Sequence, residues 1–85
     1  MKYIKTETIL NTWHTYSDDT GEYIADIVMF DEPSKYGIDG GRISKLNIHH
    51  KKNVFVALCN YDRGFDILPT EEIKDFYNEI IRTFN

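Results

Sequence analysis

The chain has 85 residues, of which 41% are hydrophobic and 14% aromatic, and its formal net charge is −4. A chain of this length can close one small core, and these fractions are ordinary for globular proteins, so the sequence predicts a single domain over residues 1–85 and excludes global disorder. The acidic balance disfavours general nucleic-acid binding, because negative charge repels phosphates.

The charge is unevenly distributed along the chain. Residues 1–40 contain three lysines and eight acidic residues, whereas residues 41–69 contain five basic residues and two aspartates. The first segment therefore offers an acidic surface to a protein partner, and the second offers a basic face. The acidic candidates are Asp18, Asp19, Glu22, Asp26, Asp31 and Glu32, and the basic ones are Arg42, Lys45, Lys51, Lys52 and Arg63.

The single cysteine, Cys59, has no partner for a disulfide within the chain, and no secretory signal opens the sequence. No apolar run approaches the roughly 18 residues that a transmembrane helix needs. We therefore expect a cytoplasmic protein with no membrane partner.

Four segments have the composition of β-strands. Residues 6–16 are rich in Thr and aromatic side chains, and the turn-forming sequence SDDTG separates them from residues 22–30, which are β-branched and aromatic. Residues 42–50 place Leu46 and Ile48 on one face and polar side chains on the other. Residues 53–61 are apolar on both faces, which predicts a central strand.

The last segment predicts an amphipathic helix. Thr70 is the expected N-cap, and two glutamates follow it, where negative charge suits the helix dipole. Apolar residues then recur with the spacing of one helix face, at Ile73, Phe76, Tyr77, Ile80, Ile81 and Phe84. Because the connections are short, the predicted fold is α+β: an antiparallel β-meander of about four strands with this C-terminal helix packed on one face.

The glycine-rich sequence YGIDGG, residues 36–41, does not have the pattern of a phosphate-binding loop. It lacks the Lys-Ser/Thr pair of a P-loop, and Asp39 would repel a phosphate. A tight connection whose glycines adopt positive φ explains it better.

No residue pattern indicates catalysis, a metal or a cofactor. Adjacent histidines on a strand point to opposite faces, so His49 and His50 are poorly placed to chelate together, and Cys59 has no CxxC partner. The sequence DDTGE lacks the spacing of a calcium loop, and no serine lies in a nucleophile-elbow motif. We therefore expect a protein that is not an enzyme and has no cofactor.

The sequence NYDRGFD, residues 60–66, fits either a structural corner or a binding site. As a corner, the Asp62 side chain accepts backbone hydrogen bonds, Gly64 takes positive φ, and the Arg63 guanidinium bridges carboxylates of Asp39, Asp62 or Asp66. As a site, it combines aromatic rings with arginine, the composition of binding hot spots. The candidate binding residues are Asp39, Arg42, Tyr61, Asp62, Arg63, Phe65 and Asp66.

The motifs YGIDGGRISKL and NYDRGFD, followed by a terminal amphipathic helix, resemble a family of small uncharacterised proteins, a domain of unknown function. The resemblance covers about residues 13–84, and Phe65 departs from the family's more frequent Trp. It implies an accessory protein of low-GC Gram-positive bacteria and their phages or mobile elements, in the cytoplasm of the host cell.

The leading hypothesis is a non-enzymatic, acidic protein-binding module, with inhibition of a bacterial defence system, as by an anti-CRISPR protein, as its specific form. A first alternative is a sheet that binds nucleic acid or a nucleotide through the basic face from Arg42 to Arg63, with Trp13, Tyr61 and Phe65 as stacking surfaces. A second alternative is a structural homodimer formed through open sheet edges.

Overall fold

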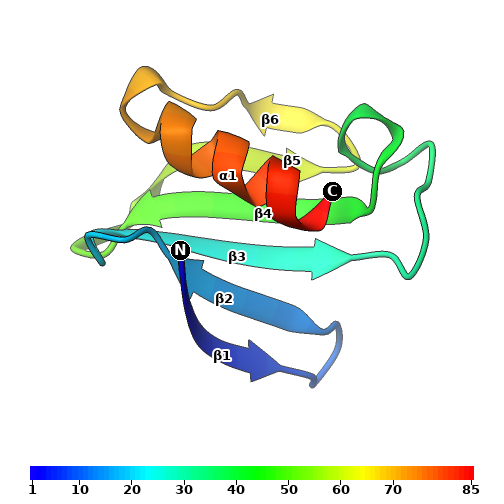
Figure 1. Ribbon diagram of the computed structural model, residues 1–85, viewed down its shortest axis with the longest axis horizontal. Helices are drawn as coiled ribbons and strands as arrows, with labels where there is room; N and C mark the ends of the chain where they lie inside the picture. Colours follow the sequence, from blue (N-terminus) through cyan, green and yellow to red (C-terminus); the bar gives the residue numbers. More distant parts are fainter.

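The computed structural model describes residues 1–85 and contains one antiparallel sheet whose six strands follow chain order (Figure 1). The strands are β1 (Lys2–Glu7), β2 (Trp13–Ser17), β3 (Tyr23–Met29), β4 (Ile43–His50), β5 (Asn53–Asp62) and β6 (Phe65–Ile67). A 3-10 helix, Ile38–Gly40, precedes β4, and a second one, Glu71–Ile73, leads into the single α-helix, α1 (Lys74–Phe84). No helix here has the length and apolar character to cross a membrane.

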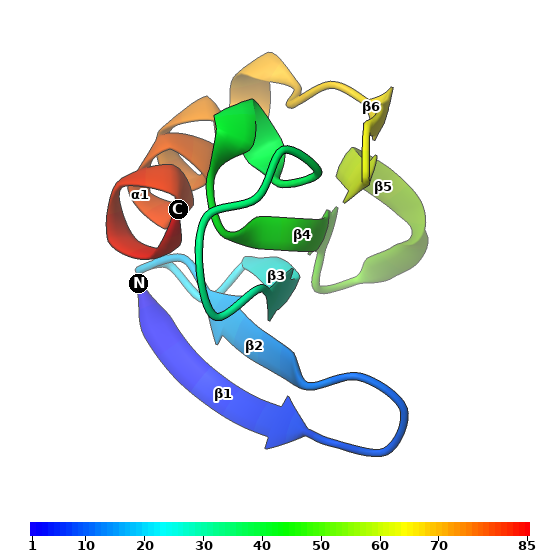
Figure 2. The same ribbon diagram turned by 90° about the vertical axis from the view of Figure 1, so that its right-hand side faces the viewer.

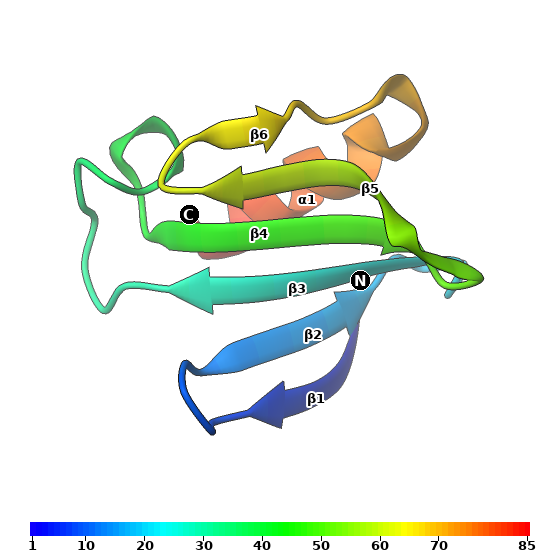
Figure 3. The same cartoon turned by 180° about the vertical axis from the view of Figure 1, so that it is seen from behind.

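The molecule has two layers, with α1 lying across β4 and β5 on one face of the sheet (Figure 1, Figure 2). The opposite face carries no covering element (Figure 3). The core lies between α1 and the sheet and consists of Ala25, Ile27, Ile38, Ile43, Leu46, Ile48, Cys59, Tyr61, Ile73, Phe76 and Ile80. The predicted α+β class, antiparallel meander and one-sided C-terminal helix are confirmed.

Strand alternation determines which side chains reach this core. Tyr16, Ala25, Ile48 and Cys59 are cross-strand neighbours on the face that α1 covers. The residues just before or after them in each strand point to the open face, where the corresponding neighbours are Thr15, Asp26, Asn47 and Asn60. One face is therefore apolar and the other polar.

The helix follows the predicted periodicity, since Ile73, Phe76 and Ile80 are buried against the sheet. Its start differs from the prediction in one respect. Thr70 precedes the first helical turn with an extended backbone, but its side chain makes no capping hydrogen bond, and its Oγ1 is buried without a partner. Its N–H donates instead to the carbonyl oxygen of Leu58, at 3.0 Å, which fastens the start of the helix to β5.

The sheet has six strands rather than about four because two features were hidden in the sequence. The segment predicted as one strand over residues 6–16 contains only the end of β1, a turn with the almost fully exposed Ile9 and Leu10, and most of β2. The first four residues of β1 precede that segment, and the sequence did not indicate them as a strand. The NYDRGFD sequence turns into a short extra strand, β6. Periodicity does not reveal a turn that contains apolar residues. It also does not reveal a strand of only three residues.

The prediction that residues 53–61 form a central strand is wrong for its first half. Only Asn60 and Tyr61 pair with β6. In the ladder with β4, His49 pairs with Ala57 and His50 with Asn53. Val54, Phe55 and Val56 therefore have no partner in β4, and their apolar side chains are exposed to solvent.

Candidate functional site

The NYDRGFD corner is held by backbone hydrogen bonds and by one tyrosine. The N–H of Asp62 donates to the carbonyl oxygen of Gly64 at 2.9 Å, and the N–H of Arg63 donates to Ser44 at 3.3 Å. Tyr61 is buried, and its hydroxyl donates to the carbonyl oxygen of Tyr36 at 2.9 Å. Its ring packs edge-on against Phe65, with centroids 4.9 Å apart. Tyr61 is therefore a structural residue.

The predicted role of Arg63 in this corner is wrong. Arg63 is exposed, and no carboxylate lies within ion-pair distance of it. The positive φ also falls on Arg63, at 60°, and not on Gly64. The turn needs a left-handed residue one position earlier than expected, and that conformation leaves the guanidinium in solvent. The Asp62 carboxylate, likewise exposed, makes none of the expected backbone hydrogen bonds.

In the glycine-rich loop, the predicted positive φ is confirmed only at Gly40, at 73°. The non-glycine residue Asp39 also adopts a positive φ, 50°. Gly37 and Gly41 are needed for close packing instead. A Cβ atom at Gly37 would overlap the carbonyl oxygen of Gly41, and one at Gly41 would overlap the side-chain amide of Asn85.

Asn85 locks this loop to the end of α1. Its Nδ2 donates to the carbonyl oxygen of Ile38 at 2.8 Å, and its Oδ1 accepts from the N–H of Ile43 at 3.0 Å. Both isoleucines are fully buried. The amide thus satisfies two backbone groups that water cannot easily reach. Nothing in the sequence marked Asn85, because its partners lie more than 40 positions away.

The seven candidate binding residues do not converge on one site. Arg42 is half-buried, and its Nε donates to the carbonyl oxygen of Phe30 at 3.2 Å. Asp39 lies in the glycine-rich loop, whereas Asp62 and Asp66 line a small hollow of about 160 Å³ on the open face. The two aspartates share that hollow with Trp13 and Lys45.

The open face also holds a larger groove of about 460 Å³ that the sequence did not reveal. It is lined by Lys5, Glu7, Trp13, Thr15, Asp26 and Asn47. Asp26 accepts a hydrogen bond from Thr15 at 2.7 Å, and the Nε2 of the buried His49 lies 3.8 Å from its other oxygen. Lys5 pairs with Glu7 at 2.8 Å. These internal pairs are typical of the solvated side of a sheet.

The six predicted acidic residues lie in three separate places. Asp18, Asp19 and Glu22 belong to the β2–β3 hairpin, and Asp26 lies on the open face. Asp31 and Glu32 follow the far end of β3. The single acidic surface expected from these residues is therefore not formed.

A different set of carboxylates does come together, in what we call the acidic groove. It is a hollow of about 390 Å³ between the β2–β3 hairpin and α1. Five carboxylates and one arginine are among its lining residues, which are Asp18, Asp19, Thr20, Glu72, Asp75, Phe76, Glu79 and Arg82. The sequence predicts the hairpin acids as part of a partner surface, but it does not indicate that the acids of the helix join them.

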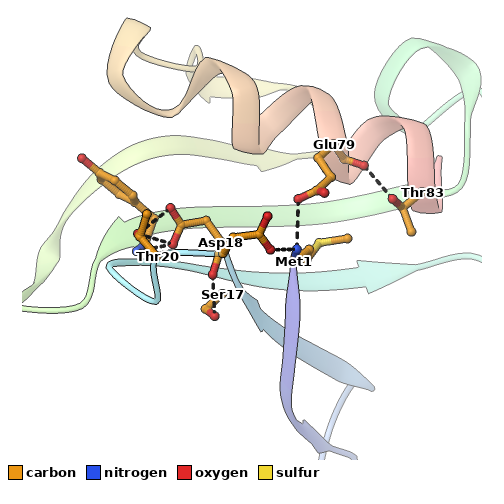
Figure 4. A network of polar contacts seen from close by, with 8 residues as sticks. Met1, Ser17, Asp18, Thr20, Glu79 and Thr83 are labelled. Atoms are coloured by element: carbon orange, nitrogen blue, oxygen red, sulfur yellow. Dashed lines mark hydrogen bonds and ion pairs between the residues drawn. The ribbon is translucent and has the colours of Figure 1, made fainter.

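A polar network fixes the hairpin side of the acidic groove (Figure 4). Asp18 accepts hydrogen bonds from the hydroxyl of Thr20 and from the N–H of Tyr23. The ammonium of Met1 contacts Asp19 and lies 3.4 Å from Glu79. The hydrogen bond from the Met1 ammonium lowers the pKa of the Asp19 carboxyl. The Tyr23 hydroxyl donates to Glu72 at 2.9 Å, which raises the pKa of Tyr23.

The five predicted basic residues are divided between the two ends of β4. Arg42 and Lys45 lie near its start, where the N–H of Arg63 bonds to Ser44. Lys51 and Lys52 form the turn after its other end. Nucleic-acid binding stays a prediction, without a continuous basic face to support it.

No group of three or more His, Cys, Asp or Glu side chains is arranged to hold a metal ion. Burial raises the pKa of the Cys59 thiol to about 12, so this cysteine is not a thiolate near neutral pH. Burial likewise raises the pKa of Tyr77 to about 12.

These features define a small α+β domain with one covered sheet face, one open polar face and an acidic groove beside its helix. The chain belongs to the family described as Domain of unknown function (DUF7678), whose model matches residues 12–85. The resemblance to a domain of unknown function is therefore confirmed over nearly the expected residues. A search of curated proteins and a search of solved structures found no match.

Proposed function

We propose that the protein is a non-enzymatic, acidic protein-binding module that acts through the acidic groove. The observation that carries the proposal is the convergence of five carboxylates from two distant chain segments on one hollow whose positive groups are Arg82 and the Met1 ammonium. Such a concentration of one sign of charge steers an oppositely charged partner and fixes its orientation. The partner is therefore a protein with a basic surface.

The specific form of the proposal is that this partner is a nucleic-acid-binding protein of a bacterial defence system. A row of carboxylates can take the place of phosphates in the basic channel of a nuclease. The motifs YGIDGGRISKL and NYDRGFD support this context, because they resemble those of proteins from phages and mobile elements of low-GC Gram-positive bacteria. The site of action is then the cytoplasm of the host cell.

The test is affinity capture from nuclease-treated host lysate with two variants of equal charge change. Asp75→Lys with Glu79→Lys reverses two charges of the acidic groove, which lie one helical turn apart. Asp31→Lys with Glu32→Lys reverses two exposed charges outside it. We expect the wild type and the second variant to retain the same stoichiometric protein, and the first variant to lose it while remaining folded.

Two results would count against the proposal. Equal recovery by both variants would remove the acidic groove as the contact surface, and recovery that disappears after nuclease treatment would favour the nucleic-acid alternative. The specific form is tested separately, by measuring phage interference in host cells that express each variant. No relief of any defence system by the wild type would refute it.

A further inference from the structure

The edge of β5 between Asn53 and Ala57 lacks a partner strand. The three residues between them, Val54, Phe55 and Val56, have no ladder partner in β4, and β6 begins its pairing only at Asn60. Figure 3 shows this first part of β5 curving across the front of the end of β4, past the end of β6. The segment thus presents an extended backbone without neighbouring strands.

The side chains of this segment are apolar and unusually exposed. Phe55 is 96% exposed, and the two flanking valines are each about half exposed. A free apolar edge strand is a template for pairing with another chain. The other edge of the sheet, β1, is protected by features that block such pairing: Lys2 and Lys5, and a bulge between Tyr3 and Lys5. The outermost strand on the side of β5 is β6, which is blunted by its length of three residues and by Asp66. The first half of β5 has no such protection.

We propose that a second copy of this chain pairs with this edge, antiparallel and two-fold symmetric about Phe55. An axis through Phe55 puts the most exposed apolar side chain of the segment at the centre of the interface. The two-fold axis therefore places Phe55 opposite Phe55 of the second copy and Val54 opposite Val56 of the second copy, as an isologous interface requires. Aromatic and β-branched pairs of this kind stabilise antiparallel strands.

Charge complementarity supports the same register. Lys52, one residue before the paired segment, comes near Leu58 of the second copy, whose carbonyl oxygen already accepts from the N–H of Thr70, so the paired segment ends at Ala57. In each chain, Leu58 shares a hollow of about 310 Å³ with Val56 and Glu72. Lys52 of each copy thus approaches Glu72 of the other, and symmetry produces this contact twice. No charged residue lies within the paired segment itself, Asn53 to Ala57.

The area available is also of the right order. An aromatic side chain buries about 150–250 Å², and a standard interface buries about 800 Å² on each partner. Phe55, two half-exposed valines and the surrounding Lys52 and Glu72 stems are sufficient for a weak dimer rather than an obligate one. This inference does not depend on the proposed function, because self-association of the purified chain requires no other partner.

The first test is sedimentation of the purified chain across a wide concentration range. We expect the mass to rise from that of the 10.0 kDa monomer to twice that value. Phe55→Glu should raise the dimer dissociation constant on the order of 30-fold or more, as for a central hot-spot residue. Leu10→Glu, at an equally exposed apolar position on the β1–β2 hairpin, should not change it. A 10.0 kDa species at every concentration would overturn the inference.

The second test reads the register through disulfide formation. Opposed residues of antiparallel strands have Cα atoms about 4.5–5.5 Å apart, within the span of a disulfide. Under mild oxidation, Phe55→Cys should form a covalent dimer, whereas Val54→Cys should not, because it faces Val56 of the second copy. Cys59 is buried and does not compete. Equal crosslinking of the two variants would contradict the two-fold axis at Phe55.

A charge exchange covers the case in which loss of Phe55 weakens the dimer too far for crosslinking. Lys52→Glu should weaken dimerisation, and adding Glu72→Lys in the same chain should restore it, since both contacts are then re-formed with opposite sign. Restoration would support the register even without a crosslink. A double variant no better than the single one would show that the two side chains do not meet.

Discussion

Replacing Asn85 by alanine should destabilise the protein strongly although the residue lies at the edge of the fold. The substitution removes both hydrogen bonds of the side-chain amide and leaves the carbonyl of Ile38 and the N–H of Ile43 without partners. Each buried backbone group left unpaired costs about 1–3 kcal/mol. An unpaired carbonyl is tolerated better than an unpaired N–H, so we expect the free energy of unfolding to fall by about 2–4 kcal/mol in total.

In a domain of this size, about 1 kcal/mol corresponds to a shift in Tm of roughly 4–8 °C. We therefore expect Asn85→Ala to lower Tm by about 10 °C or more. Urea unfolding followed by the fluorescence of Trp13, the single tryptophan, gives the free energy directly. A loss below about 0.5 kcal/mol, the range of ordinary surface substitutions, would refute the reasoning.

A double-mutant cycle tests whether Asn85 is the reason for Gly41. Gly41→Ala forces a methyl group into the Asn85 amide, whereas Gly37→Ala forces one into the backbone of Gly41. Both should destabilise the wild-type chain. In the Asn85→Ala background the first collision is removed and the second is not, so only Gly41→Ala should be partly rescued. Equal costs in both backgrounds would show that Gly41 is required for another reason.

Three further predictions follow from the backbone, the helix start and the core. Arg63→Ala should leave the free energy of unfolding unchanged within about 0.5 kcal/mol, because the Arg63 side chain is exposed and unpaired. Arg63→Gly should raise it by about 0.5–1 kcal/mol, because glycine adopts the positive φ of this position without strain. A large loss of stability in Arg63→Ala would instead support the interpretation that Arg63 bridges buried carboxylates. Thr70→Val should leave the free energy of unfolding in urea unchanged or raise it, because it removes a buried hydroxyl that has no hydrogen-bond partner. A decrease of more than about 1 kcal/mol would show that the hydroxyl does have a partner. The folded-state pKa of Cys59, about 12, lies above its ordinary value of 9.0, so this group's contribution to stability is complete below pH 9 and is lost as pH rises from 9 towards 12. Urea midpoints from pH 8 upwards should fall less in Cys59→Val than in the wild type, and parallel decreases would contradict this assignment.

The elements that were predictable from the sequence are those whose signal is local. The spacing of Ile73, Phe76 and Ile80 determines both the helix and its buried face, and the alternation around Leu46 and Ile48 locates β4 within one residue. The bulge that releases Phe55 depends on register with β4, which composition does not encode. The pairing of Asn85 with Ile38 and the grouping of hairpin and helix acids also join distant segments, so no periodicity predicts them.

The two sequence motifs and the proposed contact surfaces are different parts of the molecule. Within the motifs, Gly41 and Tyr61 are engaged by Asn85 and by Tyr36, so variants there will lose any activity through loss of folding. Phe55 and Asp75 make no hydrogen bond or buried contact that the fold requires. Variants at these exposed positions can therefore separate binding from stability. A residue that stands out in the sequence is thus a poor guide to function unless its side chain is also free of internal contacts.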